Sequence, residues 1–107
     1  MAMEAGTLSP GRITLLMVDD DPVITELFRQ YMSKQGFRVL TAGSAAEAIS
    51  LIQREAGAVR LVISDMSMPD LNGTQLAQRL LDLDPTLPVM IATGHDAESS
   101  IRAVSPN

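Results

Sequence analysis

Aspartates follow two apolar segments of this chain, and their spacing could place several carboxylates in one small volume. Asp19 and Asp20 come directly after the apolar run 13–18, and Asp65 ends the run 61–64. An aspartate at the end of a strand has an ordinary role as a turn residue that caps backbone amides. It also stands where open α/β sheets bind ligands, beyond the carboxyl ends of the strands. Which role Asp65 has depends on the acids that lie beside it.

Carboxylates that share a small volume raise one another's pKa unless a cation neutralises them. An all-oxygen donor set without His or Cys suits Mg²⁺, which takes one or two carboxylates and keeps several waters. Because proline is favoured at the first helical position, Pro22 predicts that Asp21 is the N-cap of the next helix. That role accounts for one acid and leaves Asp19 and Asp20 without an equivalent structural role.

The acids are expected to be positioned by strands and helices that alternate four times along the chain. Strands are predicted at residues 13–18, 37–41, 60–64 and 89–92. Helices are predicted at residues 22–35, 45–55 and 74–83, and finally after Asp96, with Ile101, Ala103 and Val104 as its apolar positions. Such short connections predict right-handed parallel crossovers. Parallel strands end at one edge of the sheet, so Thr93 is expected at the same edge as the acids.

The helix at 22–35 carries a broad apolar stripe at helical spacing. Ile24, Leu27 and Tyr31 are expected near the middle of the stripe, with Phe28 and Met32 on one flank. That flank is predicted to form part of a surface that binds a partner.

Composition and charge limit the classes of protein that fit. The chain has 107 residues, of which 46% are hydrophobic and 20% are charged, which is typical of one globular domain. Its net charge of -5 argues against nucleic acid as a direct ligand. The absence of cysteine excludes disulfides and thiolate metal sites, and no apolar run is long enough to span a membrane. We expect a cytoplasmic protein with a flexible tail at residues 1–12 and a domain at 13–107.

Three motifs follow one another at the predicted strand ends: the acid pair after Leu15-Leu16-Met17-Val18, then Asp65-x-x-Met68-Pro69-x-x-x-Gly73, then Thr93-Gly94. Any one of them is weak evidence, but together they are specific. With them, residues 13–104 resemble the receiver domain of bacterial two-component response regulators. The resemblance implies an α/β, flavodoxin-like parallel sheet with helices on both faces and strand order 2-1-3-4. The fifth βα unit of the family is expected to be missing.

The resemblance also implies roles for individual residues. Asp65 would be the phosphoacceptor for a phosphohistidine on a histidine kinase or a histidine phosphotransfer protein. Asp20, Asp65 and the backbone carbonyl of Ser67 would ligate Mg²⁺, with Asp19 acting through a water, and Thr93 would hydrogen-bond a phosphoryl oxygen. The chain would then be a signalling module and not an enzyme acting on a separate small molecule.

Two further positions influence the lifetime of the acyl phosphate in this family, and they correspond to Ser67 and His95. His95 is the only histidine of the chain. Its ordinary interpretation is a solvated loop residue, which is the more frequent case for a single histidine.

The chain departs from the family pattern after the fourth helix. The fifth strand of the family ends in a lysine-proline pair, whereas the only lysine here is Lys34, about 20 Å along the first helix from Asp20. Without a fifth strand, residues 89–92 are expected to be an open sheet edge, which favours a homodimer. The sequence is then either part of a longer chain or a truncated receiver that is completed by dimerisation or strand exchange.

One other function is an alternative, and a second is disfavoured by the residue at position 67. A pseudo-receiver would bind a partner without being phosphorylated, and the missing lysine favours it. A Mg²⁺-dependent phosphohydrolase of the haloacid dehalogenase kind also uses a strand-end aspartate, but needs a second acid where Ser67 stands.

Overall fold

The computed structural model describes residues 12–55, 57–92 and 101–104 of the 107. Its elements, in chain order, are β1 (Thr14–Val18), α2 (Pro22–Lys34), β2 (Arg38–Ala42), α3 (Ala45–Arg54), β3 (Val59–Asp65), α4 (Gly73–Leu83), β4 (Val89–Ala92) and β5 (Ile101–Val104). Each of the first seven lies within one or two residues of its predicted position. The predicted tail, apart from Arg12, lies outside the described residues, as do Thr93, His95 and Asp96.

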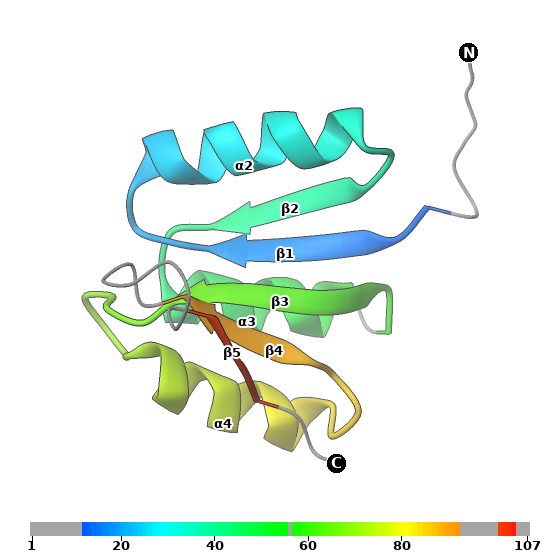
Figure 1. The fold of residues 1–107 in the computed structure, drawn as a ribbon. Coiled ribbons are helices and arrows are strands. Elements are labelled where there is room, and N and C mark those ends of the chain that lie inside the picture. The colour runs from blue at the N-terminus through cyan, green and yellow to red at the C-terminus, as the bar shows by residue number, and fades with distance from the viewer. Residues whose placement is uncertain (1–11, 56, 93–100, 105–107) are drawn as a thin grey trace.

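The strands form one twisted sheet in the order β2-β1-β3-β4-β5 (Figure 1). The first four are parallel to one another, which confirms the predicted order 2-1-3-4. Val18, the last residue of β1, is paired with Ser64 of β3. The residues that follow the two central strands therefore emerge side by side at one edge of the sheet.

The predicted last helix is wrong, because Ile101–Val104 is a strand. β5 pairs antiparallel with β4, from Val89 opposite Val104 to Ala92 opposite Ile101. The prediction of an open β4 edge is therefore also wrong. An unpaired edge offers backbone donors and acceptors, and four residues are too few for a stable helix without extensive packing. The chain has a fifth strand, but it is not the parallel βα unit that was expected to be missing.

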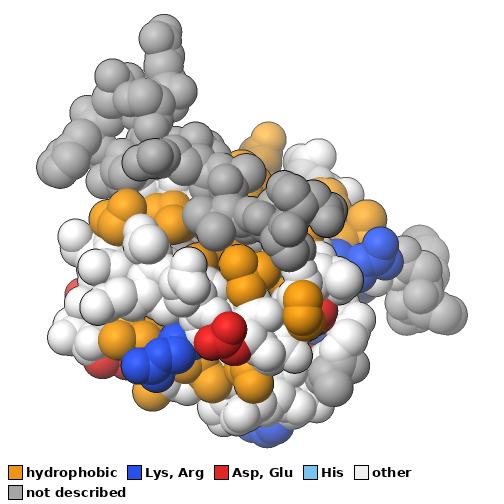
Figure 2. Space-filling view, turned by 90° about the horizontal axis from the view of Figure 1, so that it is seen from below, with side chains coloured by type: hydrophobic (Ala, Val, Ile, Leu, Met, Phe, Trp, Pro, Cys, Tyr) orange, Lys and Arg blue, Asp and Glu red, His pale blue; other side chains and the backbone are white. Residues whose placement is uncertain are grey.

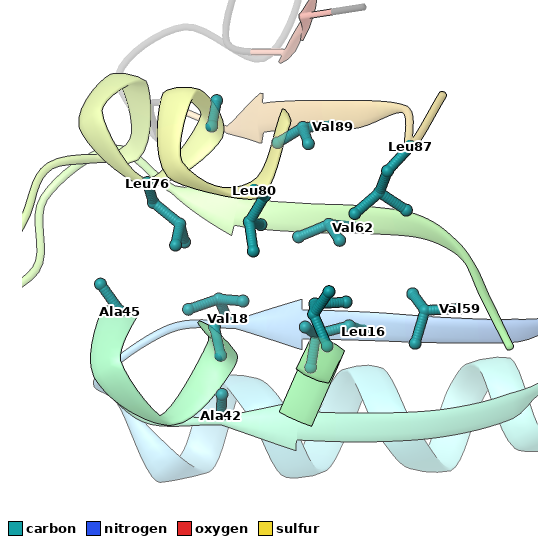
Figure 3. Packing of buried hydrophobic residues seen from close by; sticks show 13 residues of the cluster. Leu16, Val18, Ala42, Ala45, Val59, Val62, Leu76, Leu80, Leu87 and Val89 are labelled. Atoms are coloured by element: carbon teal, nitrogen blue, oxygen red, sulfur yellow. The ribbon is translucent and has the colours of Figure 1, made fainter. Parts of the chain in front are cut away.

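The main core lies between the sheet and the helices α3 and α4 (Figure 3). Leu16 of β1 and Val62 of β3 are fully buried there, against Leu76 and Leu80 of α4. Alternate residues of a strand point to opposite faces, so Leu15 and Met17 face the other side, where α2 packs on β1 and β2. All five residues of β1 are consequently buried, and the strand that ends in the acid pair is held on both faces.

The buried stripe of α2 differs from the predicted one. Thr25 is its buried residue, and Phe28 and Met32 are half-buried, so the expected partner surface is mostly turned toward the sheet. The expected centre of the stripe is exposed instead, with exposures of 42% for Ile24, 59% for Leu27 and 63% for Tyr31. The period of the apolar residues predicts a helix, but a stripe this broad does not determine which part of it meets the sheet.

The surface over α4 and the neighbouring strands carries no continuous basic patch among the described atoms visible in Figure 2. Blue Lys and Arg side chains are scattered there between hydrophobic and polar groups. None of the described helices is both long enough and apolar enough to cross a membrane.

Candidate functional site

Asp19, Asp20 and Asp65 meet at the carboxyl edge of the sheet, as predicted. One carboxylate oxygen from each residue lies within 4.8 Å of the others. Asp20 is exposed, whereas Asp19 and Asp65 are half-buried. Three anionic oxygens, without nitrogen or sulfur ligands, form a donor set that suits a hard divalent cation such as Mg²⁺.

The raised pKa values of Asp65 and Asp19 also favour a bound cation at this cluster. Partial burial raises the pKa of Asp65, and the nearby charge of Asp20 raises it further, while backbone N–H groups of Met66 and Ser67 lower it. Partial burial also raises the pKa of Asp19, where the N–H of Asp21 opposes the shift and the charges of neighbouring acids add to it. Carboxylates whose ionised form is disfavoured by burial and by neighbouring acids gain from a bound cation.

The turn between β1 and α2 fixes the orientation of the acid pair. The Asp19 backbone N–H donates to the Ala42 carbonyl at 3.0 Å, which continues the pairing with β2 beyond the strand. The Asp19 Oδ1 accepts the N–H of Asp21 at 2.9 Å. Asp21 caps α2 as predicted, because its Oδ1 accepts the N–H of Val23 at 2.9 Å. The turn thus places Asp19 and Asp20 at the site and assigns Asp21 to the helix.

The loop between β3 and α4 turns back on itself, so that Gly73 at its end lies against the Asp65 and Met66 backbone at its start. The Met66 N–H donates to the Ala92 carbonyl at 3.1 Å, and the Gly73 N–H donates to the Met66 carbonyl at 2.7 Å. A Cβ atom at Gly73 would stand 2.9 Å from the Asp65 carbonyl oxygen, which is too close for any residue except glycine. The start of α4 is therefore pressed against the end of β3, and this approach closes the loop.

Asp70 in the same loop has a role that the sequence did not reveal. Its Oδ1 accepts the N–H of Ala45 at 3.1 Å, and its Oδ2 accepts the N–H of Ala46 at 3.0 Å. These are the first two residues of α3, and the N–H groups lower the pKa of the Asp70 carboxyl. No local signal predicts a contact between positions 24 and 25 residues apart.

Two helix caps bear on the same loops. The pattern Ser44-Ala45-Ala46-Glu47 predicts a capping box, and Ser44 does accept the Glu47 N–H at 3.1 Å. The Glu47 carboxylate, however, accepts the N–H of Gly43, one residue before the cap. At α4, Asn72 and Gln75 form a complete capping box that the sequence interpretation missed.

The predicted site residues are only partly within the described chain. Asp19, Asp20 and Asp65 are brought together, and Ser67 follows in the adjoining loop, where it is exposed. Thr93 and His95 lie outside the described residues, so their predicted roles remain predictions.

Comparison with known proteins decides the family. The family model of the response regulator receiver domain matches residues 15–105. The chain belongs to this family. The chain is 41% identical over 81 residues to the transcriptional regulatory protein GlrR of Escherichia coli (strain K12). The aligned residues are 76% of this chain but 18% of that protein. The chain is 34% identical over 85 residues to the probable transcriptional regulatory protein TcrX of Mycobacterium tuberculosis, covering 79% of this chain and 36% of that protein.

Solved structures agree with this assignment. A receiver domain from Clostridium thermocellum superimposes with a TM-score of 0.75 at 29% identity, over 80% of this chain and 68% of that one. The receiver domain of the hybrid histidine kinase CckA gives a TM-score of 0.72 at 29% identity, over 78% of this chain and 77% of that one. The chain is thus a two-component receiver domain with a flavodoxin-like fold. It spans well under half the length of the two curated relatives.

Proposed function

We propose that this receiver domain accepts a phosphoryl group on Asp65 from a phosphohistidine of a histidine kinase or a histidine phosphotransfer protein. The observation that supports this most is the meeting of the Asp19, Asp20 and Asp65 carboxylates within 4.8 Å at the sheet edge. Its place of action would be the cytoplasm. It would act as a signalling module that modifies itself, and not as an enzyme for a separate substrate.

Asp65 is the proposed nucleophile. Its carboxylate oxygen attacks phosphorus, a P–O bond forms as the P–N bond breaks, and the electron pair of that bond returns to the imidazole. The transfer requires positioning and charge neutralisation more than covalent assistance. Backbone N–H groups of Met66 and Ser67 partly offset the raised pKa of Asp65 and so favour its ionised, nucleophilic form.

Asp20, Asp65 and the Ser67 carbonyl would hold Mg²⁺, with Asp19 acting through a water. When bound, the ion supplies positive charge that offsets the carboxylates and the phosphoryl oxygens. Asp19 is prepared for an outer role because its Oδ1 already accepts the Asp21 N–H. Thr93 would donate a hydrogen bond to a phosphoryl oxygen.

The test is Mg²⁺-dependent phosphorylation of the whole chain by acetyl phosphate, followed by intact mass. We expect the mass gain of one phosphoryl group on the wild type, removed by hydroxylamine, and no gain for Asp65→Asn. The control is Asp82→Asn, which changes an exposed carboxylate on α4. A wild type that gains no mass, or an Asp65→Asn variant that still does, would contradict the proposal and favour a pseudo-receiver.

We also propose that the chain forms a homodimer through α2. An open β4 edge does not support a dimer, because β5 pairs with β4. The support comes from α2, which exposes apolar side chains at helical i, i+4 spacing: Val23 is 63% exposed, Leu27 59% and Tyr31 63%. A related solved structure is the beryllofluoride-activated NtrC4 receiver domain dimer. Two copies of α2 packed antiparallel would place Leu27 of each at the centre of the interface.

A further inference from the structure

The loop that carries Ser67 is fastened at both ends. At its start, the Met66 N–H donates to the Ala92 carbonyl of β4 at 3.1 Å. Three residues beyond Ser67, the Asp70 carboxylate accepts N–H groups of Ala45 and Ala46 on α3. Between these anchors, Met68 packs against the core. The backbone of Ser67 is thus held between a strand on one side and a helix on the other.

The backbone donors around the Asp70 side chain favour a carboxylate at this position. Its two oxygens take separate N–H groups of α3, and Oδ1 also accepts the N–H of Leu71 at 3.0 Å, so three backbone donors converge on one side chain. The first residues of a helix have N–H groups without intrahelical partners, and the helix dipole favours an anion there. Ser44 takes the third such group of α3, from Glu47, which leaves the first two to Asp70.

An asparagine at this position could not replace the carboxylate. Its side chain offers one acceptor oxygen, and its NH₂ group would face a second N–H donor. Substitution by asparagine therefore keeps the size of the side chain but releases at least one of the two bonds to α3. The released loop can then shift, and with it the Ser67 backbone beside Asp65.

We propose that Asp70 is a positioning residue that sets the Mg²⁺ affinity of the acidic cluster by holding the Ser67 backbone in place from α3. This rests on the proposed function, in which the Ser67 carbonyl is a ligand of the ion. Residues that orient the ligands of a metal change its affinity without contacting it. The loop would thereby couple the metal site to the N-terminus of α3.

The experiment measures the dissociation constant of Mg²⁺ itself, by calorimetry on the whole chain, for the wild type and Asp70→Asn. We expect binding by Asp70→Asn to be weaker by roughly tenfold. Phosphorylation by acetyl phosphate should require a correspondingly higher half-saturating Mg²⁺ concentration, while its rate at saturating Mg²⁺ returns toward that of the wild type. Irreversible loss of folded protein would lower the rate and leave half-saturation unchanged, whereas reversible unfolding would also raise half-saturation, so the comparison is made at a temperature where circular dichroism shows Asp70→Asn fully folded.

Two matched variants separate the anchor from stability and from charge. Ser44→Ala removes the N-cap of α3, but leaves Asp70 in place, so it weakens the same helix without releasing the loop. Asp84→Asn makes the same chemical change at the far end of α4, where Oδ1 accepts the N–H of Thr86. Both should bind Mg²⁺ like the wild type. An equal loss in either variant would overturn the proposal.

A measurement on the wild type covers the case in which Asp70→Asn does not fold. In amide spectra, saturating Mg²⁺ should shift the signals of Ala45 and Ala46 more than that of Glu47, which is bonded to Ser44. Unmoved Ala45 and Ala46 signals would overturn the proposed coupling. A wild type that binds no Mg²⁺ would overturn the metal part of the proposed function as well, whereas unchanged binding by folded Asp70→Asn would overturn the anchor alone.

Discussion

Partial burial of the carboxylates, together with their mutual repulsion, costs this domain stability when no cation is bound. Burial and neighbouring charge raise the pKa of Asp65 and of Asp19, so both bind protons more tightly in the folded state than in the unfolded chain. Between the ordinary aspartate pKa of about 4 and the raised values, the free energy of unfolding must fall as pH rises. At neutral pH the penalty is fully present.

Asp20→Asn should relieve part of that penalty, because the charge of Asp20 helps to raise the pKa of Asp65. Without divalent ions at pH 7, we expect the variant to be more stable than the wild type by about 0.5 kcal/mol, the scale of a partly exposed charge pair. The advantage should decline as pH falls through the raised pKa of Asp65, and it should disappear well below about pH 4, where Asp65 is protonated in both states. Urea unfolding at several pH values measures this, and the Asp65 carboxyl carbon can be titrated by NMR.

Mg²⁺ supplies the complementary measurement for the same variant. A ligand that binds only the folded state stabilises it by mass action, so Mg²⁺ should raise the stability of the wild type more than that of Asp20→Asn. An Asp20→Asn variant that is no more stable at pH 7 without metal would show that Asp20 does not repel its neighbours appreciably.

At the level of loops and helices, the approach of α4 to β3 depends on Gly73. Gly73 is the first residue of α4, and its φ is not positive, so its conformation alone would admit alanine. Alanine has the better helix propensity, by up to about 1 kcal/mol in a helix interior. The contact decides the outcome, because an added Cβ would meet the Asp65 carbonyl oxygen at 2.9 Å and Ile91 Cγ2 at 3.2 Å.

We therefore expect Gly73→Ala to lower the free energy of unfolding, by about 1–3 kcal/mol, as other overpacked substitutions do. Gly43→Ala is the control, since its Cβ would meet only Glu47 Oε1, at an ordinary 3.7 Å. Urea unfolding of the two variants makes the comparison. If Gly73→Ala were as stable as Gly43→Ala, helix propensity would outweigh the close contact, and the loop would not be as tightly closed as described.

The sequence predicts these elements well where local rules decide. Apolar runs ended by acids indicated β1 and β3, and parallel strand order then brought Asp19, Asp20 and Asp65 together. Local rules fail for Ile101–Val104, since four apolar-rich residues suit a helix or a strand until an open edge is available. They also fail for Asp70, because its contact with α3 exists only after the fold has formed.

At the scale of the whole molecule, the described helices cover the two faces of the sheet unequally. α3 and α4 bury one face, whereas α2 packs on β1 and β2, and the side chains of Ile63 and Met90 on that same face stay half-buried. Apolar surface is therefore exposed both on α2 and, in part, on β3 and β4. Exposed apolar side chains at regular spacing along one helix are typical of a site of association.

The charges along α2 favour an antiparallel pair of helices over a parallel one. The acidic turn of residues 19–21 precedes the helix, and Lys34 is its last residue. In an antiparallel pair, Lys34 of the partner subunit lies toward this acidic turn, whereas a parallel pair would bring like charges together. The arrangement is also isologous, as a two-fold homodimer requires.

Leu27→Gln should weaken this dimer, because residue 27 lies midway between Val23 and Tyr31 and is therefore buried twice in a symmetric pair. Because apolar burial is lost at both copies, we expect the dissociation constant of the dimer to rise at least roughly tenfold. Sedimentation velocity over a range of protein concentrations measures it. Leu83→Gln is the matched control, since Leu83 of α4 is 46% exposed and lies on another helix. A wild type that stays monomeric, or a Leu83→Gln variant that dissociates equally, would remove α2 as the interface and leave its exposed stripe for a partner of another kind.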